Sequence, residues 1–279
     1  MRINLRFCIL VFFVFLTLIW LALPTANFSK VSAQATEPIS AREREDAYRA
    51  NNIGVAQLEQ FNHKDGAEFF RRALSLDPNL KIAQINLAIA LFNLQDIENA
   101  FIAAQKAVEL APEQPQPHYI LGLIAKNQNR TDDALAAFKR VLEIDPNDVG
   151  ANVNLGQLYA QQRKYTEAIA AFRTAISAEP YNATALYNLA TALLRNNARD
   201  EGQQLMTRFQ TLRQSGAATS LGQNYLEQGR YAEAVASTGA ESDLVDKTEP
   251  KVLFQEMPVG IKNKSSIALR LPLFRPFQG

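Results

Sequence analysis

Side chains that commonly carry out catalysis are sparse in this sequence. His63 and His118 are the only histidines, and Cys8 is the only cysteine. Neither histidine lies near a cysteine or carboxylate pattern with the spacing of metal ligands. No glycine-rich phosphate loop or G-x-S-x-G nucleophile motif occurs. We therefore expect a protein that is not an enzyme, with no catalytic residues, no metal site and no cofactor.

Asparagines recur at a fixed interval and offer a different chemistry. Asn52, Asn86, Asn154 and Asn188 share one position of a 34-residue period, and Ile120 occupies that position between the second and third of them. An amide both donates and accepts hydrogen bonds, so such a column could hold the backbone of an extended peptide. Alternatively, the amides tie neighbouring helices together or face water, because buried amides are nearly always paired.

Apolar and aromatic residues at neighbouring positions could supply anchors for the side chains of such a peptide. Packing between neighbouring repeats would use the same residues equally well, so both interpretations stay open. The candidates are Ile85, Ile89, Phe92, Tyr119 and Tyr187.

The 34-residue period extends to small residues in two series, twelve positions apart. A large or apolar residue follows the second series after four positions, and prolines close four of the periods. The first series is Gly54, Ala88, Gly122, Gly156 and Ala190, and the second is Gly66, Ala100, Ala134, Ala168 and Gly202.

Each period has the pattern of a helical hairpin. Leu155, Leu158 and Tyr159 fall on one helical stripe, as do residues of the stretch 166–176. We expect the small residues Gly156 and Ala168 to let the backbones of the two helices approach closely. Proline at the end of a period stops the second helix, because it disfavours helical geometry in the residue before it.

This pattern resembles the tetratricopeptide-repeat (TPR) family, whose signature has the same length and the same small, aromatic and proline positions. The resemblance implies an all-α solenoid of antiparallel helix pairs, wound into a right-handed superhelix that holds a peptide on its concave face. The asparagine column is similar to the ladder in the TPR region of O-linked N-acetylglucosamine transferases. The five repeats are 47–80, 81–114, 115–148, 149–182 and 183–214, followed by a partial sixth repeat or cap at 215–240.

The amino-terminal residues have the order of a secretory signal. Arg2 and Arg6 precede an apolar run over 7–23, and Ala33 to Ala35 supply an A-x-A cleavage pattern. We expect residues 1–35 to be a signal peptide, with a connector at 36–46. The alternative is an uncleaved membrane anchor, since the run reaches the lower length limit for a spanning helix. Either alternative places the repeats outside the cytoplasm, in a periplasmic, secreted or membrane-anchored protein.

Charge and the carboxyl-terminal residues complete the expectations. With 29 basic and 28 acidic residues the sequence lacks the basic stripe that nucleic acids need, so we expect a protein or extended peptide as the partner, and neither nucleic acid nor a small-molecule substrate. Residues 241–279 are expected to be mostly irregular. Parts of the repeats resemble the TPR region of exported bacterial FG-GAP/VCBS, ASPIC/UnbV-type proteins. Two functions follow: an interaction scaffold, or an accessory module of a larger enzyme or propeller protein whose carboxyl-terminal domain is missing.

Overall fold

A computed structural model describes residues 39–237 of the chain. The expected signal or anchor segment and the expected irregular region at 241–279 lie outside the described residues. Within 39–237 the structure contains ten α-helices and one 3-10 helix. Their bounds are Ala41–Glu59 (α2), His63–Leu76 (α3), Lys81–Asn93 (α4), Ile97–Leu110 (α5), Pro115–Asn127 (α6), Thr131–Ile144 (α7), Val149–Gln161 (α8), Tyr165–Ala178 (α9), Ala183–Arg195 (α10), Arg199–Ser215 (α11) and Arg230–Ala232 (η1).

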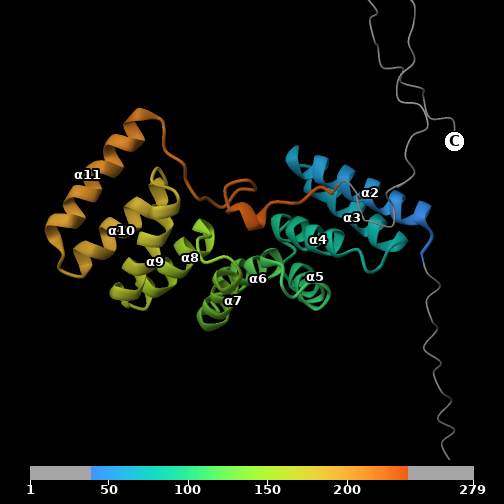
Figure 1. Cartoon of the computed structure of the whole chain (residues 1–279), viewed down its shortest axis with the longest axis horizontal. Helices are drawn as coiled ribbons and strands as arrows, with labels where there is room; N and C mark the ends of the chain where they lie inside the picture. The colour runs from blue at the N-terminus through green and yellow to red at the C-terminus, as the bar shows by residue number, and fades with distance from the viewer. Residues whose placement is uncertain (1–38, 238–279) are drawn as a thin grey trace, which may run out of the picture. The chain divides into compact units, whose positions relative to one another are not determined.

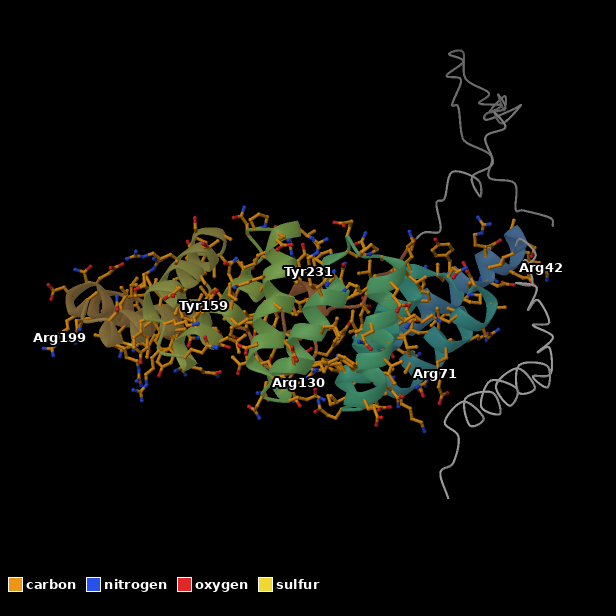
Figure 2. All side chains as sticks on the ribbon, turned by 90° about the horizontal axis from the view of Figure 1, so that it is seen from below. Arg42, Arg71, Arg130, Tyr159, Arg199 and Tyr231 are labelled. Carbon is orange, nitrogen blue, oxygen red and sulfur yellow. The ribbon has the colours of Figure 1, made fainter. Side chains whose placement is uncertain are left out.

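Consecutive helices pack as antiparallel hairpins, and each hairpin packs against the next (Figure 1). The pairs are α2 with α3, α4 with α5, α6 with α7, α8 with α9, and α10 with α11. The first helices of neighbouring hairpins also contact one another: α2 contacts α4, and α4 contacts α6. Exposed charged side chains such as Arg71 of α3 and Arg199 of α11 project from second helices (Figure 2). The predicted all-α solenoid of helix pairs is confirmed.

The turn inside each hairpin has the same backbone geometry. One residue of every turn adopts a left-handed conformation, with φ between 58° and 64°. Asparagine tolerates this region better than most residues, yet only two of the five positions carry it. The shared geometry therefore comes from the two packed helices around the turn. The five residues are Phe61, Gln95, Asn129, Arg163 and Asn197.

The first helix begins earlier than the repeat period implies. Helix α2 starts at Ala41, inside the stretch that we expected to be a connector, and is 19 residues long. Ser40 and Glu43 form a capping box, in which each side chain bonds the backbone of the other residue. This cap satisfies backbone N–H groups that the first helical turn leaves unpaired.

The glycines of the two series have different neighbours, which adds a second role to the expected close approach of the helices. A Cβ atom on Gly156 would lie 2.5 Å from the ring of Phe172, so this glycine makes room for a buried aromatic ring. Gly54 faces Phe70 and Gly122 faces Phe138 in the same way. The two glycines of the second series lie against both a side chain and the backbone of the first helix. A Cβ atom on Gly66 would meet the Leu58 side chain and lie 3.1 Å from the carbonyl oxygen of Gly54. One on Gly202 would lie 2.8 Å from the Leu194 side chain and 3.1 Å from the carbonyl oxygen of Ala190.

The residues after α11 do not continue the helical pattern. Helix α11 ends at Ser215 and is capped by Gly216, which has a left-handed φ of 73°. The only helix within residues 217–237 is η1. The expected partial sixth repeat therefore forms no helical hairpin among the described residues. A lone helix would lack a partner for its apolar stripe. Tyr225 and Ala232 are instead buried in the main core cluster beside the first helices. We call residues 217–237 the groove segment.

Replacing Gly156 with alanine should destabilise the array. Overpacking a core costs about 1–3 kcal/mol, and the higher helix propensity of alanine offsets about 1 kcal/mol of this cost. Urea unfolding followed by far-ultraviolet circular dichroism measures the net loss. Adding Phe172→Leu to Gly156→Ala should recover part of it, because the smaller side chain vacates the space. Strictly additive effects of the two substitutions would contradict the ring contact.

Candidate peptide-binding surface

Asn52 and Asn86 of the first helices each form a pair of hydrogen bonds to the backbone of the groove segment, and Asn51 adds a longer one of 3.4 Å to the Val235 carbonyl oxygen. The side-chain amide of Asn86 donates to the carbonyl oxygen of Val235 over 2.8 Å, and its oxygen accepts from the Val235 N–H over 2.9 Å. Asn52 bonds Ser237 in the same paired manner, at 2.5 Å and 3.0 Å. Alternate residues of an extended chain present their backbone groups to the same side. The two amides therefore bind backbone two residues apart without using a side chain of the segment.

A third asparagine orients this pair. Asn51, which has no exposed surface, accepts a hydrogen bond from the Asn86 amide over 2.8 Å and donates one to Asn52 over 3.2 Å. A buried network in which each amide is paired holds its members in one orientation. This role does not follow from the repeat pattern, because isoleucine, tyrosine and valine occupy the position of Asn51 in the next three repeats.

Tyr119 lies between Asn154 and the groove segment and forms a hydrogen bond with each. Its hydroxyl donates to the carbonyl oxygen of Gln228 over 2.5 Å and accepts from the Asn154 amide over 3.2 Å. Burial raises the pKa of Tyr119 far above its usual value, which keeps the hydroxyl protonated as a donor. Within the described residues, the hydrogen bonds of Asn154 are therefore linked to the groove segment through Tyr119.

A glycine of the segment fits against this hydroxyl. Gly229 has a φ of 105°, a backbone conformation that side chains other than glycine rarely adopt. A Cβ atom at Gly229 would also lie 2.5 Å from the Tyr119 oxygen. Both constraints explain why glycine follows Gln228 at this point.

Two carboxylates bind the next residue of the segment. Arg230 forms an ion pair with Asp145 and donates from Nε to Asp148 over 3.2 Å. The Tyr231 hydroxyl donates to Asp145 over 2.7 Å. Asp148 also caps α8 by accepting from the Ala151 N–H over 2.6 Å. Asp145 directly follows α7 and Asp148 directly precedes α8, and sequence reasoning assigned neither of them to the site.

Asp148 is an ionisable group with little contact with water. Only 3% of its surface is exposed. Burial raises the pKa of its carboxyl to about 6, the hydrogen bond from the Ala151 N–H opposes this shift, and the negative charge of Glu179 adds to it.

A hydroxyl on α10 binds the beginning of the segment. Thr184 accepts from the Leu221 N–H over 3.0 Å and donates to the Leu221 carbonyl oxygen over 3.3 Å. Just before it, Thr219 exchanges backbone hydrogen bonds with Ala183 and Tyr181. From Thr219 to Ser237 the segment thus passes from the fifth repeat to the first (Figure 1).

Aromatic packing secures the middle of the segment. The ring of the buried Tyr225 lies edge-on to the rings of Phe61 and His63, with centroids 6.5 Å and 5.6 Å away. The Tyr225 hydroxyl accepts from the Ala234 N–H over 3.0 Å. Burial lowers the pKa of His63, which favours the neutral imidazole in this packing.

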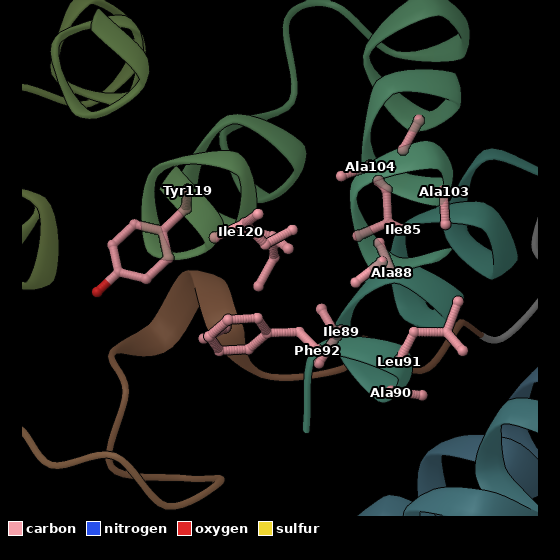
Figure 3. Close-up of a cluster of buried hydrophobic side chains, with 14 of the residues drawn as sticks. Ile85, Ala88, Ile89, Ala90, Leu91, Phe92, Ala103, Ala104, Tyr119 and Ile120 are labelled. Carbon is pink, nitrogen blue, oxygen red and sulfur yellow. The ribbon is translucent and has the colours of Figure 1, made fainter. Parts of the chain in front are cut away.

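The remaining residues of the predicted site are placed differently. Ile85 and Ile89 are buried in the main core cluster, where they pack with neighbouring repeats (Figure 3). Phe92, also largely buried, lines a cavity beside the groove segment. Asn188 bonds the Thr184 carbonyl oxygen of its own helix over 2.8 Å. Tyr187 is half exposed and lies against Phe209. The structure thus brings Asn52, Asn86 and Tyr119 directly to the segment.

The cavity beside Phe92 has a volume of about 530 Å³ and also contains Lys126. The ammonium group of Lys126 donates to the side-chain oxygens of Asn154 and Gln157, each over 2.6 Å. Burial lowers the pKa of Lys126. Within residues 39–237, no carboxylate forms an ion pair with it. These two hydrogen bonds join Lys126 of α6 to polar side chains of α8 in the cavity beside the groove segment.

Searches for other kinds of site give two findings. No cluster of three or more metal-ligating side chains occurs in the described part of the chain. Among the helices that the structure describes, none is long and apolar enough to cross a membrane.

Comparison with known proteins identifies the repeats. A family model described as tetratricopeptide repeat matches residues 52–115, 85–149, 119–183 and 153–203, which together cover more than half of the chain. A second tetratricopeptide-repeat model matches residues 215–237, the groove segment and its link to α11. No curated protein matches the chain.

Several solved structures have a similar fold. MamA residues 41-end from Desulfovibrio magneticus RS-1 is 20% identical, with a TM-score of 0.55, and the match covers 61% of this chain and 97% of that one. A double mutant of MamA RS-1 has a TM-score of 0.56 at 21% identity, over 62% of this chain and 97% of the other. YrrB, described as a TPR protein with an unusual peptide-binding site, has a TM-score of 0.51 at 20% identity, over 61% and 88%. These matches give no support for the expected resemblance to FG-GAP/VCBS or ASPIC/UnbV proteins.

Asp148 should make the stability of the array depend on pH. The folded chain holds this proton up to about pH 6, whereas an unperturbed carboxyl loses it near 3.8. The folded state therefore binds more protons between these values, and the free energy of unfolding falls as the pH rises through this window. The difference between the two pKa values corresponds to at most about 3 kcal/mol.

Asp148→Asn isolates this effect, because asparagine also caps helices but does not titrate. Urea unfolding of both proteins at several pH values from about 4 to about 7 measures the difference between them. We expect wild type to lose stability relative to the variant as the pH rises. A difference that stays constant over this range would show that Asp148 is ionised throughout.

Proposed function

Because the chain belongs to the tetratricopeptide-repeat family, we propose that it is a non-catalytic scaffold that holds an extended segment of a partner protein against its first helices. The paired hydrogen bonds of Asn52 and Asn86 to Ser237 and Val235 carry this proposal. They are bonds to backbone, which any extended peptide can offer. The similar fold of YrrB, which is described as having a peptide-binding site, adds support.

The proposed location of this scaffold is outside the cytoplasm. Support comes from Arg2 and Arg6, from the apolar run after them and from the A-x-A pattern ending at Ala35. A membrane anchor formed by the same run would place the repeats on the same side. Sequencing the amino terminus of the protein isolated from its native cell envelope distinguishes Thr36, which indicates cleavage, from Met1 or Arg2, which indicates an anchor.

The asparagine pair should determine affinity for a peptide. A suitable probe is a displayed library of unstructured peptides, selected on the full chain carrying Val235→Pro and Ser237→Pro. These substitutions remove the two N–H groups that bond Asn86 and Asn52, so the amides are left available. We expect Asn52→Ala with Asn86→Ala to weaken the selected peptides by about tenfold or more, since each lost hydrogen bond contributes about 0.5–1.5 kcal/mol.

Asn188→Ala is the matched control. It removes an amide at the same repeat position that bonds only its own helix in the described structure. Fluorescence anisotropy of the selected peptides should show nearly unchanged affinity for this variant. Equal losses for the paired substitution and the control, or none for either, would show that the column does not bind peptide. Thermal unfolding of each variant separates loss of affinity from loss of fold.

A further inference from the structure

We propose that the groove segment is an intramolecular ligand that competes with the partner for the first-helix surface. The partner is then expected to share its chemistry: an extended backbone at the asparagine pair and a basic side chain at Asp145 and Asp148. This inference rests on the proposed peptide binding, because a competitor requires a site that binds external peptides. Three features of the segment support it.

The first feature is that most hydrogen bonds between the segment and the repeats use the backbone of the segment. Asn52 and Asn86 each bond one N–H and one carbonyl group, and Thr184 does the same for Leu221. Tyr119 bonds the carbonyl oxygen of Gln228. A segment from another protein could form every one of these bonds, since they do not depend on the identity of its side chains.

The second feature is a single charged contact at a fixed place. Arg230 meets the Asp145 and Asp148 carboxylates, five residues before Val235 and seven before Ser237. Charged partners at such a place favour one register of a peptide over others. We therefore expect a partner segment with a basic residue about five positions before the backbone that Asn86 binds.

The third feature is the way in which the segment is attached. It joins α11 through Gly216, whose left-handed backbone has no atom within 4 Å of an added Cβ. Residues 217–237 contribute no helix to a hairpin, so none of the five helix pairs includes a part of the segment. Near the far end, Val235 is 38% exposed despite its two backbone bonds. Release of the segment would expose the core surface that Tyr225 and Ala232 cover, and a partner segment would have to cover that surface again.

Attachment in the same chain makes the segment an effective competitor. A ligand on a short flexible linker has an effective concentration on the order of millimolar. An external peptide that forms the same contacts would therefore bind little at micromolar concentration. Weakening the contacts of the groove segment should allow that peptide to bind.

The test uses a fluorescent peptide with the sequence of residues 217–237 and the full chain in three forms. The forms are wild type, Val235→Pro with Ser237→Pro, and Ala236→Pro. The paired substitution removes the N–H groups that bond the asparagines. Ala236→Pro is the matched control, because the Ala236 N–H donates no hydrogen bond within the described residues and proline keeps the preceding residue extended.

We expect the paired variant to bind the peptide about tenfold more tightly than either wild type or Ala236→Pro, because only its own segment is weakened. In wild type, amide hydrogen exchange should be slower at Val235 and Ser237 than at Ala236. Equal peptide affinities in the three forms, or fast exchange at Val235 and Ser237 in wild type, would overturn the competition.

Further substitutions separate failure of this inference from failure of the proposed function. If all three forms bind the peptide equally, and Asn52→Ala with Asn86→Ala abolishes this binding, the competition is overturned. The proposed peptide-binding site would then still stand. Absence of binding in every form would overturn both. A wild-type dimer in light scattering that dissociates in the paired variant would overturn the intramolecular assignment, since the segment would then be exchanged between copies.

Reversing the charges of the paired side chains tests the expected basic residue of the partner. A peptide with glutamate in place of Arg230 should bind the paired variant about tenfold more weakly, because its carboxylate would face Asp145 and Asp148. Asp145→Lys should restore affinity for this altered peptide and lower affinity for the original one. Insensitivity to both changes would remove the basic residue from the description of the partner.

Discussion

Packing of aromatic rings onto glycines of the neighbouring helix fixes the geometry on which the surface depends. Phe70, Phe138 and Phe172 are fully buried, and each ring occupies the space that a Cβ atom of Gly54, Gly122 or Gly156 would need. Where the first helix has alanine instead, at positions 88 and 190, the second helix has Ala104 or Met206 in place of phenylalanine. A larger residue on the first helix is thus accompanied by a smaller or more flexible residue at the facing position of the second helix, as a densely packed core requires.

Because the hairpins share this packing, one position of every first helix faces the same surface. Asn52 and Asn86 are therefore placed side by side, and Asn51 holds their amides in a bonding orientation. Asn154 occupies the same position but lies behind Tyr119, because the ring of Tyr119 extends between it and the groove segment. The column is interrupted at Ile120, and among the described residues its asparagines bond the segment directly at Asn52 and Asn86.

The groove segment combines neutral backbone contacts with one buried charge. Asp148 caps α8 and receives Arg230, so a residue that stabilises the array also binds the segment. Ionisation of a buried carboxylate is costly unless partners compensate for it. The Ala151 N–H and the Arg230 guanidinium are such partners. Binding of the segment therefore affects how readily the Asp148 carboxyl ionises.

The sequence determined the fold, since the 34-residue period specifies which residues share a helical stripe and therefore which faces must be buried. It also singled out Asn52, Asn86 and Tyr119, because amides and aromatic rings recur at positions of the first helices. It did not show that Gly156 accommodates Phe172, which depends on the offset between packed helices. Nor did it place residues 217–237, whose sequence is similar to a repeat. Only the tertiary structure decided that Tyr225 and Ala232 enter the core beside the first helices, because a half-repeat without a partner helix buries its apolar side chains better on a surface that is already formed.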